Sequence, residues 1–253
     1  KLARLAEQAE KSLDLNGISA LASNAPALDC GEPEINRYEP FRVAVARDRA
    51  FCFYYEDSLS VLETMGVQLV PFSPLTDDKL PEGIHGLYLG GGYPELYAKE
   101  LSENETMRKS IRTALKNGLP CIAECGGFMY LTQAIGAHPM AGVLPGKCFD
   151  NGKLTRFGYV TLTAKKDNLL CAAGEQIRGH EFHHWDAEET GADFIAEKLS
   201  GKRWDCVFAT DTLYAGYHLV VVYTEHGDGG SKQHHIGGLL GSTGFFSEFL
   251  YIQ

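Results

Sequence analysis

The segment at positions 118–131, GLPCIAECGGFMYL, constrains the fold of this chain more strongly than any other stretch. Residues 120–124 form a short apolar run typical of a buried strand, and residues 128–135 have the spacing of a helix. The triplet Cys125-Gly-Gly stands between them. A strand that turns sharply into a helix through small residues presents the side chain at the turn above the carboxyl end of its sheet. We therefore expect a strand, a tight turn with a thiol at its tip, and a helix.

The thiol of Cys125 has two interpretations, a catalytic nucleophile or a cysteine packed like a small apolar residue. The two glycines that follow favour the nucleophile, because a merely packed residue would not need them. A thiol with a reference pKa of about 8.5 is only about 3% ionised at neutral pH, whereas a helix N-terminus and an imidazolium are expected to lower that pKa to roughly 6. Because the gain in thiolate is only roughly thirtyfold, an oxyanion site must supply more of the rate.

A second glycine-rich loop, GGGYPE, follows an apolar run at 84–89 and so lies at another strand end. Its residues Gly90, Gly91 and Gly92 let the backbone approach a ligand with no Cβ in the way. The candidate oxyanion donors are the backbone N–H of Gly126 and one backbone N–H from this loop. A plain flexible turn is the alternative interpretation of this loop.

Composition and charge exclude several classes of function. Of the 253 residues 44% are hydrophobic, which is enough for a full core, and the formal net charge is −10. This acidic balance argues against nucleic acid or an anionic membrane surface as a partner. No apolar run reaches the roughly 18 residues of a transmembrane helix, so we expect a cytoplasmic protein with no membrane partner.

The cysteine pattern and the search for a phosphate-binding loop bear on metals and nucleotides. Seven cysteines, an odd number without framework spacing, are interpreted as reduced thiols. Cys121 and Cys125 lack the two-residue gap of a zinc pair and no second pair follows, so no metal site is expected. The nearest match to a phosphate-binding loop, GVLPGKC at 142–148, is one residue short and lacks the hydroxyl, so no nucleotide site is expected.

Strand patterns alternate with helical patterns from residue 42 to residue 135. The predicted strands cover 42–46, 67–72, 84–89 and 119–124, and the predicted helices cover 55–65, 106–116 and 128–135. This alternation predicts an α/β protein with a mostly parallel central sheet, helices on both faces and a ligand site at the carboxyl ends of the strands. Farther along, strand patterns predominate, at 156–164, 178–185 and 213–223.

Three regions are predicted along the chain. Residues 1–39 combine a helical segment, 1–21, with a proline-containing linker. Because the chain starts KLARL, without a methionine, we expect a piece of a longer protein, with residues 1–39 as the helical tail of a preceding domain and its linker. Residues 40–225 form the main domain, and residues 226–253 are a Gly-rich polar tail to which no structure is assigned.

Three groups of histidines compete for the role of general base. In GHEFHHWD at 179–186, alternation puts His180 on one face of a strand and His183 on the other, and a ligand-facing or structural strand is favoured. His218 enters an apolar run, where a lone histidine is more often a core residue than a catalyst. The third group, at positions 226, 234 and 235, belongs to the polar tail.

Several of these segments together resemble the glutaminase half of cobyrinic acid a,c-diamide synthases. They are ARDRAFCFYYE at 46–56, LPEGIHGLYLGGGYPELY at 80–97, AECGG at 123–127, FGY at 157–159 and RGHEFH at 178–183, and the similarity covers roughly residues 1–185. The resemblance implies the flavodoxin-like fold of class I glutamine amidotransferases. It also implies that Cys125 is the nucleophile and that the loop from Gly90 to Gly92 forms the oxyanion site with Gly126. We place His183 with these substrate-binding residues.

The resemblance also implies a reaction and its partners. The thiolate attacks the side-chain amide of glutamine, a histidine protonates the leaving ammonia, and the thioester is hydrolysed to glutamate. Ammonia then passes to a side-chain carboxylate of cobyrinic acid in cobalamin biosynthesis, activated by ATP, with Mg²⁺, in a synthetase domain of the same full-length protein. The implied partners are glutamine, that synthetase domain and a tetrapyrrole acceptor, and no cofactor is expected within this chain. Amidation of another tetrapyrrole, such as sirohaem or nickel-sirohydrochlorin, and a catalytically impaired glutaminase-like domain stay open.

The general base is where the chain departs from the family pattern. Members typically read ASYVHLHF near the end, whereas this chain reads AGYHLVVV at 215–222. Without a gap the catalytic position falls on Leu219, which cannot move a proton, and a one-residue deletion restores it to His218. Successive strand residues point to opposite faces, so a bulge or turn must aim His218 at Cys125. We predict that His218 is the base, within hydrogen-bond reach of the thiol or one water away.

Overall fold

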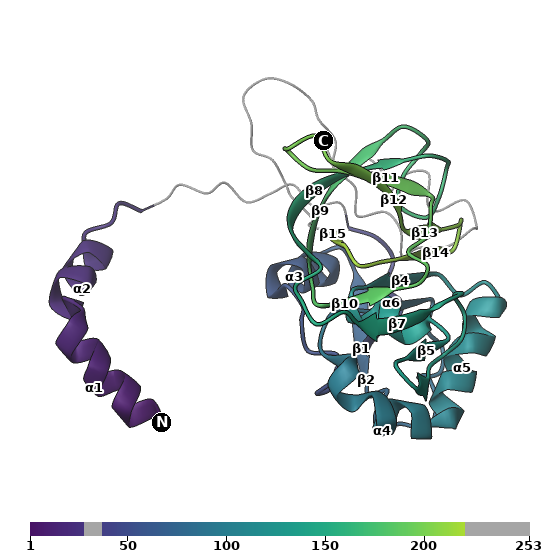
Figure 1. Cartoon of the computed structure of the whole chain (residues 1–253), viewed down its shortest axis with the longest axis horizontal. Helices are drawn as coiled ribbons and strands as arrows, with labels where there is room; N and C mark the ends of the chain where they lie inside the picture. The colour runs from purple at the N-terminus through teal and green to yellow at the C-terminus, as the bar shows by residue number, and fades with distance from the viewer. Residues whose placement is uncertain (28–36, 221–253) are drawn as a thin grey trace. The chain divides into compact units, whose positions relative to one another are not determined.

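A computed structural model describes residues 1–27 and 37–220 of the chain (Figure 1). The chain divides into two compact units, residues 1–33 and residues 34–253. The tail predicted at 226–253, its three histidines and the end of the strand predicted at 213–223 lie outside the described residues.

The first unit contains two helices, α1 (Leu2–Ser12) and α2 (Leu15–Ser23). The helical pattern predicted for 1–21 is confirmed, with one interruption at Leu13, which is extended with φ −121° and ψ 141°. The Asp14 carboxylate accepts a hydrogen bond from the Gly17 N–H at 2.9 Å, so it caps a new helix. A capping residue inside the helical pattern therefore divides it in two.

The main unit is built on a six-stranded sheet in the order β13-β14-β4-β3-β1-β2. The strands are β1 (Phe41–Ala46), β2 (Val67–Phe72), β3 (Gly86–Leu89), β4 (Cys121–Glu124), β13 (Phe208–Ala209) and β14 (Leu213–Gly216). Neighbours are parallel except for β13 and β14. The mostly parallel sheet is thus confirmed. Because β3 pairs with β4, with Leu89 opposite Ala123, the loops that follow these two strands leave the sheet side by side.

Helices cover both faces of this sheet, as predicted. They are α3 (Glu56–Thr64), the 3-10 helix η1 (Pro94–Tyr97), α4 (Ala98–Glu103), α5 (Glu105–Lys116) and α6 (Gly126–Leu131). Leu62 of α3 packs with Val43 of β1. Ile111 of α5 and Phe128 of α6 belong instead to the main core with Ala44, the next residue of β1, whose side chain points to the opposite face. Within the described residues, no helix has the length and apolarity needed to cross a bilayer.

Two smaller sheets complete the main unit. One contains β5 (Ala134–Ile135), β6 (His138–Pro139), β7 (Lys147–Asp150) and β10 (Trp185–Ala187). The other is antiparallel and contains β8 (Arg156–Ala164), β9 (Gln176–His183), β11 (Phe194–Glu197), β12 (Arg203–Cys206) and β15 (Leu219–Val220). The strand predicted at 156–164 is confirmed as β8. The strand predicted at 178–185 is confirmed only as far as His183, where β9 ends, because Trp185 begins β10 in the other small sheet. Val160 and Leu162 of β8 share a second core with Tyr214 of β14, which joins this sheet to the parallel one.

One predicted helix is shorter than its apolar pattern. The helix predicted at 128–135 ends at Leu131, and Ala134–Ile135 is a strand instead. Thr132 is extended, with ψ 179°, and its hydroxyl donates to the Met129 carbonyl at 2.7 Å. A threonine that satisfies a terminal carbonyl in this way favours the end of a helix over its continuation.

The strand predicted at 213–223 changes sheets along its length. It begins in the parallel sheet as β14 and stops at Gly216, and it resumes at Leu219 as β15, which pairs with β9. Tyr217 and His218 lie at the crossing point between the two sheets. This crossing is what brings β9 close to the carboxyl end of β14.

Candidate active site

Cys125 forms the turn between β4 and α6, with φ 50° and ψ −101°. Its N–H donates to the Gly216 carbonyl at 2.8 Å, and its own carbonyl accepts from the Met129 N–H at 3.0 Å. The predicted sequence of strand, tight turn and helix is confirmed. Positive φ is costly for a residue with a side chain, and in the described chain it occurs at only one other non-glycine residue, Val207. Such strain persists where the surroundings enforce it, most often at functional sites.

The glycines after the thiol are required by close packing against the glycine-rich loop. A Cβ on Gly127 would lie 2.0 Å from the Leu89 carbonyl oxygen. The Gly127 N–H also donates to the Gly90 carbonyl at 3.0 Å, so the two segments cannot simply move apart. A Cβ on Gly126 would meet the Pro94 ring at 3.0 Å and the Gly92 backbone nitrogen at 3.2 Å, a tighter contact than usual but a milder one than at Gly127. The elbow and the loop therefore form one packed unit at the ends of β3 and β4.

The loop of three glycines is held in place by its neighbours. The Gly90 N–H donates to the Tyr54 hydroxyl at 3.0 Å, and a Cβ on Gly92, at φ 155°, would lie 2.1 Å from the Ala50 carbonyl oxygen. These contacts argue against a plain flexible turn. Because Tyr54 engages the Gly90 N–H, the predicted oxyanion role falls to the N–H groups of Gly91 and Gly92, with that of Gly126 from the elbow.

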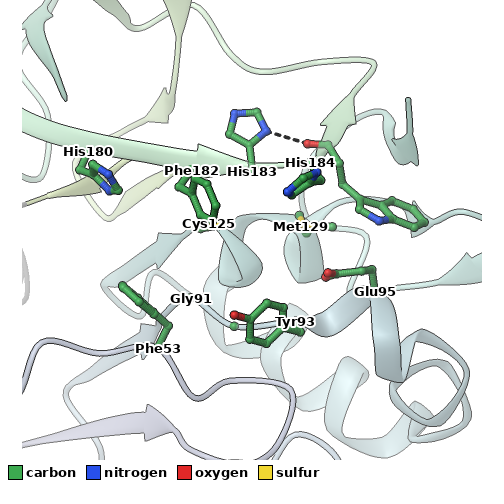
Figure 2. A pocket seen from close by; sticks show the side chains of 12 residues that line it. Phe53, Gly91, Tyr93, Glu95, Cys125, Met129, His180, Phe182, His183 and His184 are labelled. Carbon is green, nitrogen blue, oxygen red and sulfur yellow. Dashed lines mark hydrogen bonds between the residues drawn. The ribbon is translucent and has the colours of Figure 1, made fainter. Parts of the chain in front are cut away.

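A cavity of about 170 Å³ opens beside the thiol, between this loop and β9 (Figure 2). It is lined by Phe53, Gly91, Gly92, Tyr93, Glu95, Cys125, Met129, His180, Phe182, His183, His184 and Trp185. Four residues predicted for the site, Gly91, Gly92, Cys125 and His183, thus surround one space. Gly90 and Gly126 are their chain neighbours, and His218 does not line the cavity.

The sequence interpretation missed the side of β9 that faces the cavity. His180 and Phe182, with His184 just beyond the strand, line the space that Cys125 faces. Strand alternation could have found them, since residues two apart share a face. The alternation predicted for His180 and His183 is confirmed, because His183 is buried whereas His180 and its alternate neighbours are more exposed.

The thiol is held in its protonated form by its surroundings. Burial raises the pKa of the Cys125 thiol to about 12; the nearby carboxylates of Glu95 and Glu124 add to the rise, and the backbone N–H of Gly126 opposes it. The expectation of a lowered pKa is therefore wrong for this structure, because one N–H contact does not outweigh burial and two carboxylates. Cys125 keeps partial exposure toward the cavity, and the direction of the shift means that a base must take the proton before the sulfur can attack.

Two of the histidines considered for catalysis, His183 and His218, lie against Glu181 of β9. The Nε2 atom of His218 is 3.3 Å from Glu181 Oε2, and the Nε2 atom of His183 is 3.9 Å from the same oxygen. His218 is 1% exposed. His218 lies two residues after Gly216 in the chain, and the Gly216 carbonyl accepts a hydrogen bond from the Cys125 N–H. These positions bring His218 close to the elbow in the fold, and its role as the base stays a prediction.

Comparison with known proteins gives one family. The model of the CobB/CobQ-like glutamine amidotransferase domain matches residues 42–218. A cobyrinate a,c-diamide synthase of Caldanaerobacter subterraneus subsp. tengcongensis is 40% identical over 232 residues, which are 88% of this chain and 51% of that protein. One of Dehalococcoides mccartyi is 42% identical over 189 residues, 71% of this chain and 41% of that protein. The chain thus spans about half the length of the curated relatives it matches.

A solved glutamine amidotransferase structure shares the fold, with a TM-score of 0.50 at 16% identity over 70% of this chain and 89% of that one. The resemblance read from the elbow, the glycine-rich loop and β9 is confirmed by the relatives. This chain belongs to the family of CobB/CobQ-like glutamine amidotransferase domains.

Proposed function

We propose that this chain is the glutaminase half of a glutamine-dependent amidotransferase, with Cys125 as its nucleophile. The observation that carries the proposal is the strained backbone of Cys125 (φ 50°, ψ −101°) at a turn that faces a cavity. A structural cysteine has no need of this conformation, whereas a nucleophile gains exposure at the end of a strand. The packed glycine loop beside it supplies backbone N–H groups with no Cβ in the way.

In the proposed reaction, the base takes the proton of Cys125, and the sulfur bonds to the amide carbon of glutamine. Negative charge develops on the amide oxygen, where the N–H groups of Gly91, Gly92 and Gly126 stabilise it. The base then returns its proton to the nitrogen as the carbon–nitrogen bond breaks, which releases ammonia and leaves a thioester. Water, deprotonated by the same base, attacks the thioester, and the carbon–sulfur bond breaks to give glutamate and the free thiol.

The acceptor of the ammonia is proposed from the relatives. Because the matching proteins are cobyrinate a,c-diamide synthases about twice as long as this chain, we assign the carboxylate amidation of cobyrinic acid to the full-length protein. Its other half would bind ATP and Mg²⁺ and choose the tetrapyrrole. We also propose the cytoplasm as the compartment of this reaction, and the free thiols of the six described cysteines support this proposal.

Replacement of the nucleophile tests the proposal. Cys125→Ala should abolish both glutamate release from glutamine and covalent labelling by a diazo ketone analogue of glutamine, because none of the other five cysteines that the structure describes stands at an elbow. Cys52→Ala is the matched control, since Cys52 is the exposed free cysteine of the described chain and its loss should leave labelling unchanged. Labelling that persists on Cys52 or Cys121 in the Cys125→Ala variant would overturn the assignment.

A catalytically impaired domain is the second candidate, and the position of His218 favours it. His218 is buried against Glu181 and does not line the cavity that holds Cys125. Two measurements separate the two candidates. If the wild-type chain is labelled at Cys125 but releases no glutamate, the domain is catalytically impaired. If the wild-type chain releases glutamate and His218→Asn does not, His218 is the working base.

A further inference from the structure

Glu95 supplies the one carboxylate among the described residues that line the cavity beside Cys125. Figure 2 shows its side chain turned toward that space, across from His184. Much of the remaining wall consists of aromatic and apolar side chains, such as Phe53, Phe182 and Met129. A single charged group in a largely apolar pocket is the kind of feature that orients a ligand.

The backbone of Glu95 is fixed relative to the thiol. The 3-10 helix η1 begins at Pro94, which is buried and lies against Gly126 of the elbow. The proline ring fixes φ at this position, and the Leu96 N–H donates to the Tyr93 carbonyl at 3.1 Å, which closes the turn. The carboxylate that follows Pro94 therefore has a defined place in the cavity.

Glu95 has no cation of its own in the part of the chain that the structure describes. No described side chain forms a hydrogen bond or an ion pair with its carboxylate. Burial raises the pKa of Glu95, and Asp150 adds to the rise, while the backbone N–H of Glu95 and the imidazole of His184 oppose it. The charged form is thus disfavoured, and a positive group on a ligand would stabilise it.

The same carboxylate works against the nucleophile. The negative charge of Glu95 contributes to the raised pKa of the Cys125 thiol. Such a charge hinders a sulfur that must ionise, unless a cation neutralises it in the complex. A group that binds the substrate through a positive charge meets this condition, because the cation arrives with the substrate and removes the hindrance.

We propose that Glu95 binds the α-ammonium group of glutamine and so makes the site specific for the free amino acid over amides that carry no cation. The inference rests on the proposed glutaminase function. In that reaction the amide lies between the Cys125 sulfur and the N–H groups of the glycine loop, and the α-carbon end extends into the cavity. The contact is a charge-assisted hydrogen bond from the ammonium to the carboxylate.

Three substrates isolate this contact in a kinetic test. Glutaramate is glutamine without the α-ammonium group, and 4-aminobutanamide keeps the ammonium but lacks the α-carboxylate. In the wild type, kcat/KM for glutaramate should be roughly 10- to 100-fold below that for glutamine. Glu95→Gln should lower kcat/KM by a similar factor for glutamine and 4-aminobutanamide and should not lower it for glutaramate. Glu95→Asp, which keeps the charge, should retain part of the preference for glutamine.

The ratio between substrates separates recognition from a structural role. A distorted site would hydrolyse all three amides more slowly, whereas loss of the ammonium contact spares glutaramate. Glu103→Gln is the matched control, because Glu103 is exposed on α4 and pairs with Lys99 at 3.8 Å, so the ratio should not change. A wild type that hydrolyses glutamine and glutaramate equally well, or equal losses for both in Glu95→Gln, would overturn the inference and leave the proposed function intact.

Calorimetry with Cys125→Ala measures the same preference without turnover. This variant should bind glutamine roughly 10- to 100-fold more tightly than glutaramate, and Glu95→Gln in the same background should remove the difference. Equal affinities, or no binding of glutamine, would contradict the role of Glu95. A wild type that neither releases glutamate nor is labelled at Cys125 would refute the proposed function, and the binding preference would still decide whether Glu95 recognises the ammonium.

Discussion

The strain at Cys125 makes an unusual prediction about stability. At φ 50° and ψ −101°, a residue with a Cβ is expected to cost about 1–3 kcal/mol relative to a relaxed backbone. Cys125→Ala keeps the Cβ and hence the strain, whereas Cys125→Gly removes it. Glycine in turn stabilises the unfolded chain by about 0.5–1 kcal/mol through its greater conformational freedom. The difference predicts that Cys125→Gly is more stable than Cys125→Ala by about 1 kcal/mol.

Two variants that both lack the thiol isolate the backbone effect. For a domain of this size, about 1 kcal/mol corresponds to a rise in Tm of about 2–4 °C, which calorimetry or urea unfolding resolves. The matched control is Cys121, four residues earlier in β4 and fully buried, where the order should reverse, with glycine less stable than alanine. The reasoning fails if glycine is also the less stable residue at position 125.

Three further outcomes are expected. Gly127→Ala should cost more than about 3 kcal/mol or prevent folding, because its Cβ would lie 2.0 Å from the Leu89 carbonyl oxygen. Gly126→Ala, whose Cβ would approach no atom closer than 3.0 Å, should cost only about 1 kcal/mol in urea unfolding. Calorimetry with Mg-ATP should show no micromolar binding, since the chain has no complete phosphate-binding loop; such binding would contradict that interpretation. The pKa of Glu181 is lowered on folding, so its stabilising contribution is present above its unfolded pKa of about 4.3 and is lost as pH falls through the folded value. The difference in unfolding free energy between the wild type and Glu181→Gln should therefore shrink below about pH 4.3, and a constant difference would contradict it.

Much of the fold and half of the candidate site could be predicted because they depend on neighbours in the sequence. The alternation of strand and helix fixes the parallel sheet, and Cys125-Gly-Gly fixes the elbow. The contact between the elbow and the glycine loop also follows, because parallel strands that pair bring their carboxyl ends together. The end of α6 at Leu131 was harder to predict, because the apolar pattern continues past it and only the hydrogen bond of Thr132 to the Met129 carbonyl ends the helix there.

The electrostatics of the site could not be predicted in the same way. The pKa of the Cys125 thiol depends on burial and on Glu95, which the turn of η1 brings to the cavity, and neither is visible in the local pattern. The partners of Glu181 come from Lys198 and His218, 17 and 37 positions away along the chain, on separate elements. Sequence periodicity reports which face of an element is buried, and it does not report which charges meet there.

The crossing between β14 and β15 decides which side chain meets Glu181. The Tyr217 ring packs 4.8 Å from Phe128 on the α6 side, while His218 lies against Glu181. Because successive strand residues alternate, a slip of one residue would exchange the two and place a phenol beside the buried carboxylate. A phenol has a single oxygen, whereas an imidazole has two ring nitrogens, so only the imidazole can face Glu181 with one nitrogen and keep the other as a proton acceptor. The polar contact with Glu181 therefore supports this register together with apolar burial.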